Sequence, residues 1–236
     1  MKKIATLALA LLAFSAVAAS AAGPFFARGG YYDAGWSAIS GPGGNELVEG
    51  PAGVFTAAIT SPMPAGYYEG KAALGDWSSS WPNSNQSVFI TGPGDVVNWS
   101  YDTNTYADGW SPSTNIVIND HAVTGLTFEV IGAAPETGSW GSGVAAVLGG
   151  DVWSVALSIA TPGTYDVKFR KTGDWGINVG ADGVGTNSNN YSYTTTLPGE
   201  LMLFQFNQKT GRMRVVPGGA TPTRSTTFGG IKALYR

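Results

Sequence analysis

The stretch Gly163-Thr-Tyr-Asp-Val-Lys-Phe-Arg-Lys-Thr-Gly-Asp-Trp-Gly176 decides how the rest of the chain is interpreted. Its apolar residues Tyr165, Val167 and Phe169 alternate with charged ones, which is the period-two pattern of a strand with one buried face. The Thr-Gly-Asp that follows has the composition of a turn, and Trp175 comes directly after it. The stretch therefore predicts a half-buried strand that runs into a turn closed by a tryptophan.

A second copy of this stretch occurs earlier in the chain, as Gly66-Tyr-Tyr-Glu-Gly-Lys-Ala-Ala-Leu-Gly-Asp-Trp77. In both copies a glycine leads to a tyrosine, a lysine lies three residues beyond that tyrosine, and Gly-Asp-Trp closes the run. Before it, Val54–Ile59 matches Val152–Leu157, and after it Gly94–Thr105 matches Gly199–Thr210. Because these segments keep their order, they indicate a tandem repeat of about 100 residues, too long a period for a solenoid.

The first residues have the features of a secretory signal peptide. Lys2 and Lys3 precede an apolar run from Ile4 to about Ala18, and small residues follow up to Ala22. A membrane anchor is the alternative, but the run is short of the about 20 apolar residues that a spanning helix needs. We therefore expect residues 1–22 to be removed and the protein to be exported to the periplasm, the cell surface or the medium.

The composition favours a globular all-β protein with many tight turns. The chain has 34 glycines, 12% charged residues and 12% aromatic residues, whereas disordered chains carry high charge and few aromatics. It has no cysteine, so each domain must be held together by core burial alone. The formal net charge of −3, with no visible basic patch, argues against nucleic acid or an anionic membrane as a partner.

Strand-like windows bounded by turn residues recur at short intervals, and helical periodicity is missing after the signal. We therefore predict an all-β chain of two tandem immunoglobulin-like β-sandwiches, residues 23–121 and 124–217, with a junction near Asn119–Gly125. The expected strands are Arg28–Trp36, Glu46–Val48, Val54–Thr60, Tyr67–Leu74, Gln86–Thr91, Asp95–Tyr101, Asn115–Asn119, Gly125–Ile131, Ala145–Leu148, Val152–Ile159, Thr164–Lys171, Asn190–Leu197, Glu200–Gln208 and Arg212–Val216.

A linker and C-terminal tail at 218–236 follow the second sandwich. Pro217–Thr227 is small and polar, which is typical of a flexible linker, and Phe228–Arg236 is short, apolar and basic. This terminus either docks on the second sandwich or frays, or it is a sorting or attachment tag read by secretion or surface-anchoring machinery. It is too short to be a membrane anchor.

The repeated order of elements resembles a known family. It is similar to the Ig-like modules appended to bacterial pullulanases and to the starch-binding outer-membrane proteins of the SusE/SusF type. The resemblance rests on Thr164–Phe169, Gly173–Gly183, Asn189-Asn190 and Phe204–Asn207, and covers 124–217 well and 25–121 loosely. It implies an Ig-like fold and binding of an α-glucan.

The first copy departs from the family pattern in two ways. Gly70 and Ala72 replace the strand residues Val167 and Phe169, and the segment Ser78–Gln86 replaces a Gly/Asp-rich loop. These departures make the second copy the better candidate for binding.

Carbohydrate binding needs exposed aromatic faces for the sugar rings and a few polar groups for the hydroxyls. Trp81 and Trp140 are the leading candidates, because they are expected in Ser/Gly-rich loops, where packing does not readily explain a large aromatic. Trp77 and Trp175 either bind or close the end of a sandwich, whereas Trp99 and Trp153 follow strand alternation and are expected in the core. The candidate carbohydrate-binding residues are Trp140, Trp175, Lys168, Lys171 and Asn189 in the second copy, and Trp36, Trp77, Trp81 and Lys71 in the first. The alternative for Lys71 and Lys168 is that of solvated strand residues.

Catalysis and metal binding find little support. His121 is the only histidine and there is no cysteine, so a Cys-His pair and a zinc site lack their residues. The 16 acidic residues leave a glycosidase pair of carboxylates open on composition, but turn geometry accounts for Asp76 and Asp174. Calcium at Asp102–Asp108 or Gly180–Gly183 is the alternative to ordinary hairpin turns. We predict no enzyme activity, no cofactor and no metal.

The sequence thus predicts a secreted, non-catalytic carbohydrate-binding protein whose partner is a polysaccharide or oligosaccharide, with α-glucan taken from the resemblance. The alternative is a structural or adhesive cell-surface protein whose sandwiches mediate protein–protein contacts.

Overall fold

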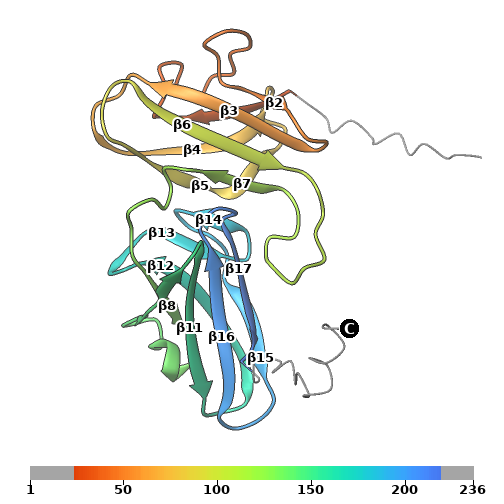
Figure 1. Cartoon of the computed structure of the whole chain (residues 1–236), viewed down its shortest axis with the longest axis vertical. Coiled ribbons are helices and arrows are strands. Elements are labelled where there is room, and N and C mark those ends of the chain that lie inside the picture. Colours follow the sequence, from red (N-terminus) through yellow and green to blue (C-terminus); the bar gives the residue numbers. More distant parts are fainter. Residues whose placement is uncertain (1–23, 219–236) are drawn as a thin grey trace, which may run out of the picture.

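The computed structural model describes residues 24–218, which form antiparallel β-strands and one short 3-10 helix. The predicted all-β sandwich class is confirmed. Strands β1–β7, here called the N-terminal unit, lie at one end of the molecule, and β8–β17, the C-terminal unit, lie at the other (Figure 1). The expected signal peptide and the tail Phe228–Arg236 fall outside the described residues.

In the N-terminal unit the strands follow the order β5-β4-β1-β2-β3-β6-β7. Because β2 pairs with β1 through Leu47 and with β3 through Val48, one layer continues into the other instead of forming a separate sheet. The core between the layers contains Phe25 and Trp99. The strands are β1 (Phe25–Gly29), β2 (Glu46–Glu49), β3 (Val54–Ser61), β4 (Gly66–Leu74), β5 (Ser80–Ile90), β6 (Asp95–Asp102) and β7 (Ile116–Asn119).

Buried amide side chains hold together the two far edges of this unit. Gln86 Nε2 on β5 donates to the Val117 carbonyl oxygen on β7 at 2.6 Å, and Asn119 Nδ2 donates to Gln86 Oε1 at 3.0 Å. Both side chains are fully buried, so these bonds replace the water that the edges would otherwise need.

In the C-terminal unit a four-stranded sheet, β10-β11-β16-β17, faces a second sheet, β14-β13-β12-β8-β9, on which β15 also pairs with β12. Their core includes Trp153, Phe169 and Phe206. The elements are β8 (Phe128–Gly132), η1 (Pro135–Thr137), β9 (Val144–Ala145), β10 (Val147–Gly149), β11 (Val152–Ile159), β12 (Gly163–Lys171), β13 (Asp174–Gly180), β14 (Gly183–Gly185), β15 (Tyr191–Thr195), β16 (Glu200–Asn207) and β17 (Arg212–Pro217).

Most expected strands are present within a residue or two of their predicted bounds, and Trp99 and Trp153 are buried as predicted. The expected strand Arg28–Trp36 is wrong beyond Gly29, where the chain turns back over the sheet; a Cβ on Gly29 would clash with Glu69. The strands β13 and β14 were not predicted, because their glycines and aspartates have the composition of a loop.

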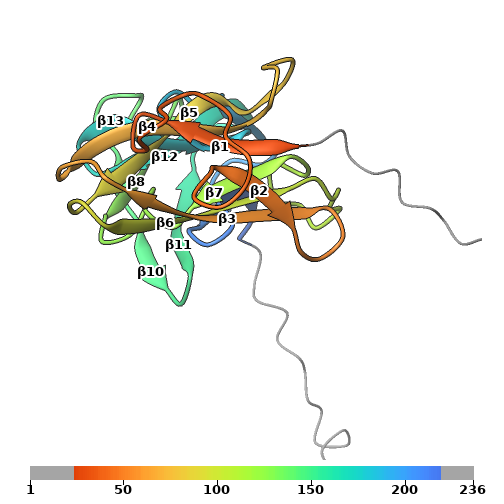
Figure 2. The same cartoon turned by 90° about the horizontal axis from the view of Figure 1, so that it is seen from above.

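The two units contact each other through the loop between β6 and β7. Arg212 on β17 forms a two-pronged ion pair with Asp108, with nitrogen–oxygen distances of 2.7 and 2.9 Å, and also donates to the Trp110 and Pro112 carbonyl oxygens. The backbones of Ser111 and Met213 form an isolated antiparallel β-bridge. Viewed from above, β1, β2 and β3 lie in front of the strands of the C-terminal unit (Figure 2).

Candidate functional site

In both Gly-Asp-Trp turns the aspartate side chain accepts a hydrogen bond from the backbone amide two residues ahead. Asp174 Oδ1 accepts a hydrogen bond from the Gly176 amide at 2.8 Å, and Asp76 Oδ1 accepts one from the Ser78 amide at 3.0 Å. An aspartate bonded to the amide two residues ahead closes a tight turn, so the residue between them is pushed outward. In this way Trp175 is 42% exposed and Trp77 is 44% exposed.

Trp140 reaches Trp175 through the loop that follows β8. The short helix η1 is capped at its C-terminal end by Gly138. A φ of 86° and the close approach of Ser142 exclude a side chain at this glycine. The Trp140 amide then donates to the Gly132 carbonyl oxygen at 2.9 Å. This fold-back lays the Trp140 ring beside Trp175, with centroids 6.3 Å apart and planes inclined by 38°.

A buried arginine lies behind this Trp140–Trp175 pair. The Arg170 guanidinium carbon is 4.6 Å from the centroid of the Trp175 ring, and Arg170 is only 7% exposed. Its Nε forms a 2.5 Å ion pair with Glu129 on β8, and its Nη2 lies 3.4 Å from the Gly141 carbonyl oxygen. The cation therefore contacts the Trp175 ring from within, while Trp175 stays exposed and Trp140 is partly buried.

The N-terminal unit contains a comparable arrangement. The rings of Trp36 and Trp77 are 6.1 Å apart and inclined by 43°, and the Arg28 guanidinium carbon is 4.2 Å from the Trp77 centroid. Arg28 donates to the Trp36 carbonyl oxygen at 3.3 Å and to that of Gly75 at 2.5 Å. It thereby ties the loop and the turn that carry the two rings.

Asn45 anchors the loop that carries Trp36. Its side chain is fully buried and donates to the Ala27 and Ser37 carbonyl oxygens while it accepts from the Ile39 amide. These bonds hold both ends of the loop against β1, so Trp36 is placed by contacts distant in sequence.

The two arginines differ in their charge partners. Arg170 is paired with Glu129, whereas Arg28 has no carboxylate within ion-pair distance among residues 24–218, and its buried Nε lacks a hydrogen-bond partner there. Burial lowers the pKa of Arg28, and the turn carboxylate Asp76 acts in the opposite direction.

Lys168 and Asn189 form a neighbouring polar group with Asp182. Asn189 bonds to Asp182 through its backbone amide, at 2.6 Å, and through its side chain, at 3.2 Å. Lys168 alternates with core residues of β12 and so shares the outer face with Arg170, two residues further along. It is 8% exposed; burial lowers its pKa, and the charge of Asp182 opposes this shift.

Lys71 and Lys171 are the other two candidate lysines. Lys71 Nζ donates to the Asn83 carbonyl oxygen at 3.2 Å, and burial lowers its pKa. Lys171 forms a 2.9 Å ion pair with Asp174 and lies 5.1 Å from the centroid of the Tyr67 ring, at the boundary between the units.

The expectation that Trp81 lies in a loop is wrong. It lies on β5 opposite Ala72 and is stacked on Tyr101, with centroids 4.8 Å apart, at the edge of the core. The physical reason is volume: Ala72 stands where the C-terminal unit has Phe169, and the Trp81 ring fills the space that the small side chain leaves.

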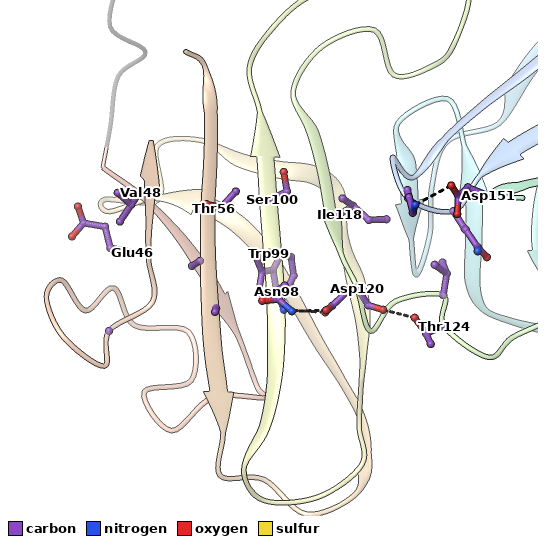
Figure 3. A pocket seen from close by; sticks show the side chains of 16 residues that line it. Glu46, Val48, Thr56, Asn98, Trp99, Ser100, Ile118, Asp120, Thr124 and Asp151 are labelled. Atoms are coloured by element: carbon purple, nitrogen blue, oxygen red, sulfur yellow. Dashed lines mark hydrogen bonds and ion pairs between the residues drawn. The ribbon is translucent and has the colours of Figure 1, made fainter. Parts of the chain in front are cut away.

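A groove of about 870 Å³ crosses the outer face of β2, β3, β6 and β7 (Figure 3). Its floor has short side chains such as Thr56 and Ser100, and the ion pair of Asp151 with Lys209 borders it. Asn98 and Asp120 bond to each other across the floor. The aromatic residue in its lining, Trp99, is 2% exposed, so the groove offers no ring for a sugar to stack on.

Among residues 24–218 no group of three potential metal-ligating side chains converges. The carboxylate of Asp102 accepts bonds from Asn104 and Tyr106, and that of Asp108 is held by Arg212. Asp182 is engaged by Ser188 and Asn189. Each suggested calcium carboxylate thus serves a turn or a junction.

The sequence did not single out Arg28 or Arg170, because each lies in a strand whose charged positions were interpreted as solvated. A cation on a strand close to a Gly-Asp-Trp turn is the signal that could have identified Arg170. For Arg28 the signal is weaker, since it lies far from Trp77 in sequence.

The chain matches no known family model and no curated protein sequence. Within the described part of the chain, no helix has the length and apolar character needed to cross a membrane.

Proposed function

We propose that the protein is an exported, non-catalytic carbohydrate-binding protein, with an α-glucan as the ligand. One observation carries the proposal: each unit has a pair of inclined tryptophan rings at its surface, with Trp140 partly buried and the other three exposed, and a buried arginine behind each pair. Two rings at an angle form a shallow platform that suits the C–H faces of adjacent pyranose units.

The surroundings of the Trp140–Trp175 pair support a sugar ligand. Asp182 and Asn189, which are not buried, supply donors and acceptors, which is what orienting hydroxyl groups requires. Because Arg170 is neutralised by Glu129, the pair favours an uncharged ligand.

Matching contacts support a tandem duplication of one Ig-like module. The Gly30 amide donates to the Glu69 carbonyl oxygen, and the Ala133 amide donates to that of Asp166. The hydroxyls of Tyr68 and Tyr165 each donate to a carbonyl oxygen four residues earlier, at 3.0 and 2.9 Å. On this proposal the protein carries two sites on one chain.

Affinity electrophoresis in amylopectin tests the proposal. We expect the protein to be retarded, and the combined variant Trp140→Ala with Trp175→Ala to be retarded less. Leu197→Ala, which removes an exposed apolar side chain elsewhere, is the matched control. Migration of the wild type at the same rate with and without polysaccharide would contradict the proposal.

A structural or adhesive role is the second candidate, and the edge strand β10 favours it. Val147 is 71% exposed and Leu148 is 41% exposed on a strand that pairs on one side only among residues 24–218. Exposed apolar edge strands can pair with other chains. Sedimentation of the wild type and of Val147→Lys distinguishes the roles, because self-association lost in the variant would favour adhesion.

A further inference from the structure

A second hollow lies at the boundary between the two units, and no tryptophan of the described chain lines it, although Asp174 and Gly176 on either side of Trp175 do. Its volume is about 280 Å³, close to the lower end of the about 300–1,000 Å³ usual for small-ligand sites. Its lining includes Tyr67, Glu69 and Ser87 from the N-terminal unit and Lys171, Asp174 and Thr186 from the C-terminal unit. Neither unit alone forms this junction groove.

Tyr67 provides the groove with an aromatic surface. Its side chain is 55% exposed, although it lies on a strand whose opposite face is buried. Phe89 on β5 flanks the ring, with centroids 5.0 Å apart, and Lys171 Nζ lies 5.1 Å from the ring centroid. The ring is therefore held in place while more than half of it remains available for contact.

The polar groups of the groove have unused bonding capacity among residues 24–218. Lys171 has three N–H donors, of which the ion pair with Asp174 uses one, and Glu69 accepts one side-chain hydrogen bond, from Asn85. Two carboxylates and one ammonium group give the lining a net negative charge. Anionic sugars and phosphates are repelled, whereas hydroxyl groups can both donate and accept.

The groove is held open by bonds between the units. The Ser87 hydroxyl donates to the Gly176 carbonyl oxygen at 3.1 Å, and the Thr186 amide donates to that of Asn85 at 2.7 Å. A ligand thus meets a preformed surface and does not have to order it, which favours affinity.

We propose that the junction groove binds one pyranose unit of a neutral polysaccharide, which stacks on Tyr67 and bonds to Lys171, Asp174 and Glu69 through its hydroxyls. The choice of a sugar as ligand rests on the proposed function, whereas the groove itself is lined by neither tryptophan pair. A polysaccharide that fills the groove touches both units at once.

Proton–nitrogen correlation spectra of the full protein test this site. The probes are maltoheptaose, cellohexaose and mannohexaose, each titrated to tens of millimolar. We expect the amides of Ser87 and Thr186 to shift with at least one of them. Tyr67→Ala should weaken binding at these amides at least tenfold, whereas Tyr67→Phe, which keeps the ring, should not.

Lys171→Gln provides a second variant, and should weaken binding at the groove severalfold without loss of the fold. The indole resonances of Trp140 and Trp175 separate this inference from the proposed function. Shifts of the indoles without shifts in the groove overturn the inference and leave the function standing. Shifts in the groove alone support the inference and contradict the Trp140–Trp175 pair as a sugar site. Groove shifts that persist unchanged in Tyr67→Ala, or no groove shifts with any probe, also overturn the inference.

Discussion

Trp77 and Trp140 adopt the same uncommon backbone conformation, with φ values of 64° and 62°. Each is one member of a tryptophan pair, and each pair therefore contains one ring held on a left-handed backbone. Bulky residues rarely adopt this region, which costs of order 1 kcal/mol or more and is concentrated at functional sites. The fold maintains this conformation in both units, where a glycine would avoid the cost.

The exposed rings should dominate sugar binding. We expect Trp175→Ala to weaken binding of maltoheptaose at the C-terminal pair about tenfold or more, because losing a central aromatic contact costs roughly 1.4 kcal/mol or more. Isothermal titration calorimetry measures the change. Trp175→Tyr keeps a ring and should bind more tightly than Trp175→Ala. Equal affinities of the two variants would mean that stacking on this ring does not contribute.

The ion pair behind Trp175 should matter for stability. Arg170→Met leaves the Glu129 carboxylate buried without its partner, and we expect a loss of about 3–5 kcal/mol in the free energy of unfolding. Urea denaturation measures this. The double variant Arg170→Met with Glu129→Leu removes both charges and should recover most of the loss. A double variant as unstable as the single one would show that the pair has no such role.

His121 should make stability depend on pH. Burial lowers its pKa, but hydrogen bonds to Asp120 and Asp95 outweigh burial and raise the pKa above its ordinary value. The protonated form is thus favoured in the folded state, and its contribution is full below about pH 6.5 and is lost as pH rises through the raised value.

Urea midpoints at pH 5.5 and pH 8.5 measure this dependence. We expect the wild type to lose stability between the two, and His121→Gln to lose less. The same fall in both proteins would assign the pH dependence to other groups.

The Arg212 contacts should hold the two units together. We expect Arg212→Ala to lower the free energy of unfolding by about 1–3 kcal/mol, since it removes charged hydrogen bonds to Asp108 and to two carbonyl oxygens. It should also speed proteolysis in the loop at 103–115. Lys209→Ala breaks the exposed pair with Asp151 and should change stability by less than about 1 kcal/mol. Similar effects of both variants would contradict a special role for Arg212.

Strand alternation and turn residues were sufficient to predict the all-β class and most strands, because the alternation that gives each strand a buried face depends only on neighbouring residues. The positions of the segments that complete the tryptophan pairs could not be predicted in this way. Trp36 and Trp140 are placed by backbone and side-chain bonds to distant residues, such as those of Asn45 and of the Trp140 amide. Trp81 was misplaced because its environment depends on Ala72, on another strand.

The cation behind each pair comes from a different strand. Arg28 lies on β1, where its register partner on the adjacent strand is Lys71. Arg170 lies on β12, where its register partner on the adjacent strand is Glu129. When the halves are superposed strand by strand, Arg170 falls on Ala73 and Arg28 falls on Ile131. An alignment of the two units therefore does not place the two arginines at the same position. Proteins with the same arrangement should therefore be sought by the spatial trio of two indoles and a guanidinium, because the guanidinium can reach the ring from either of two neighbouring strands.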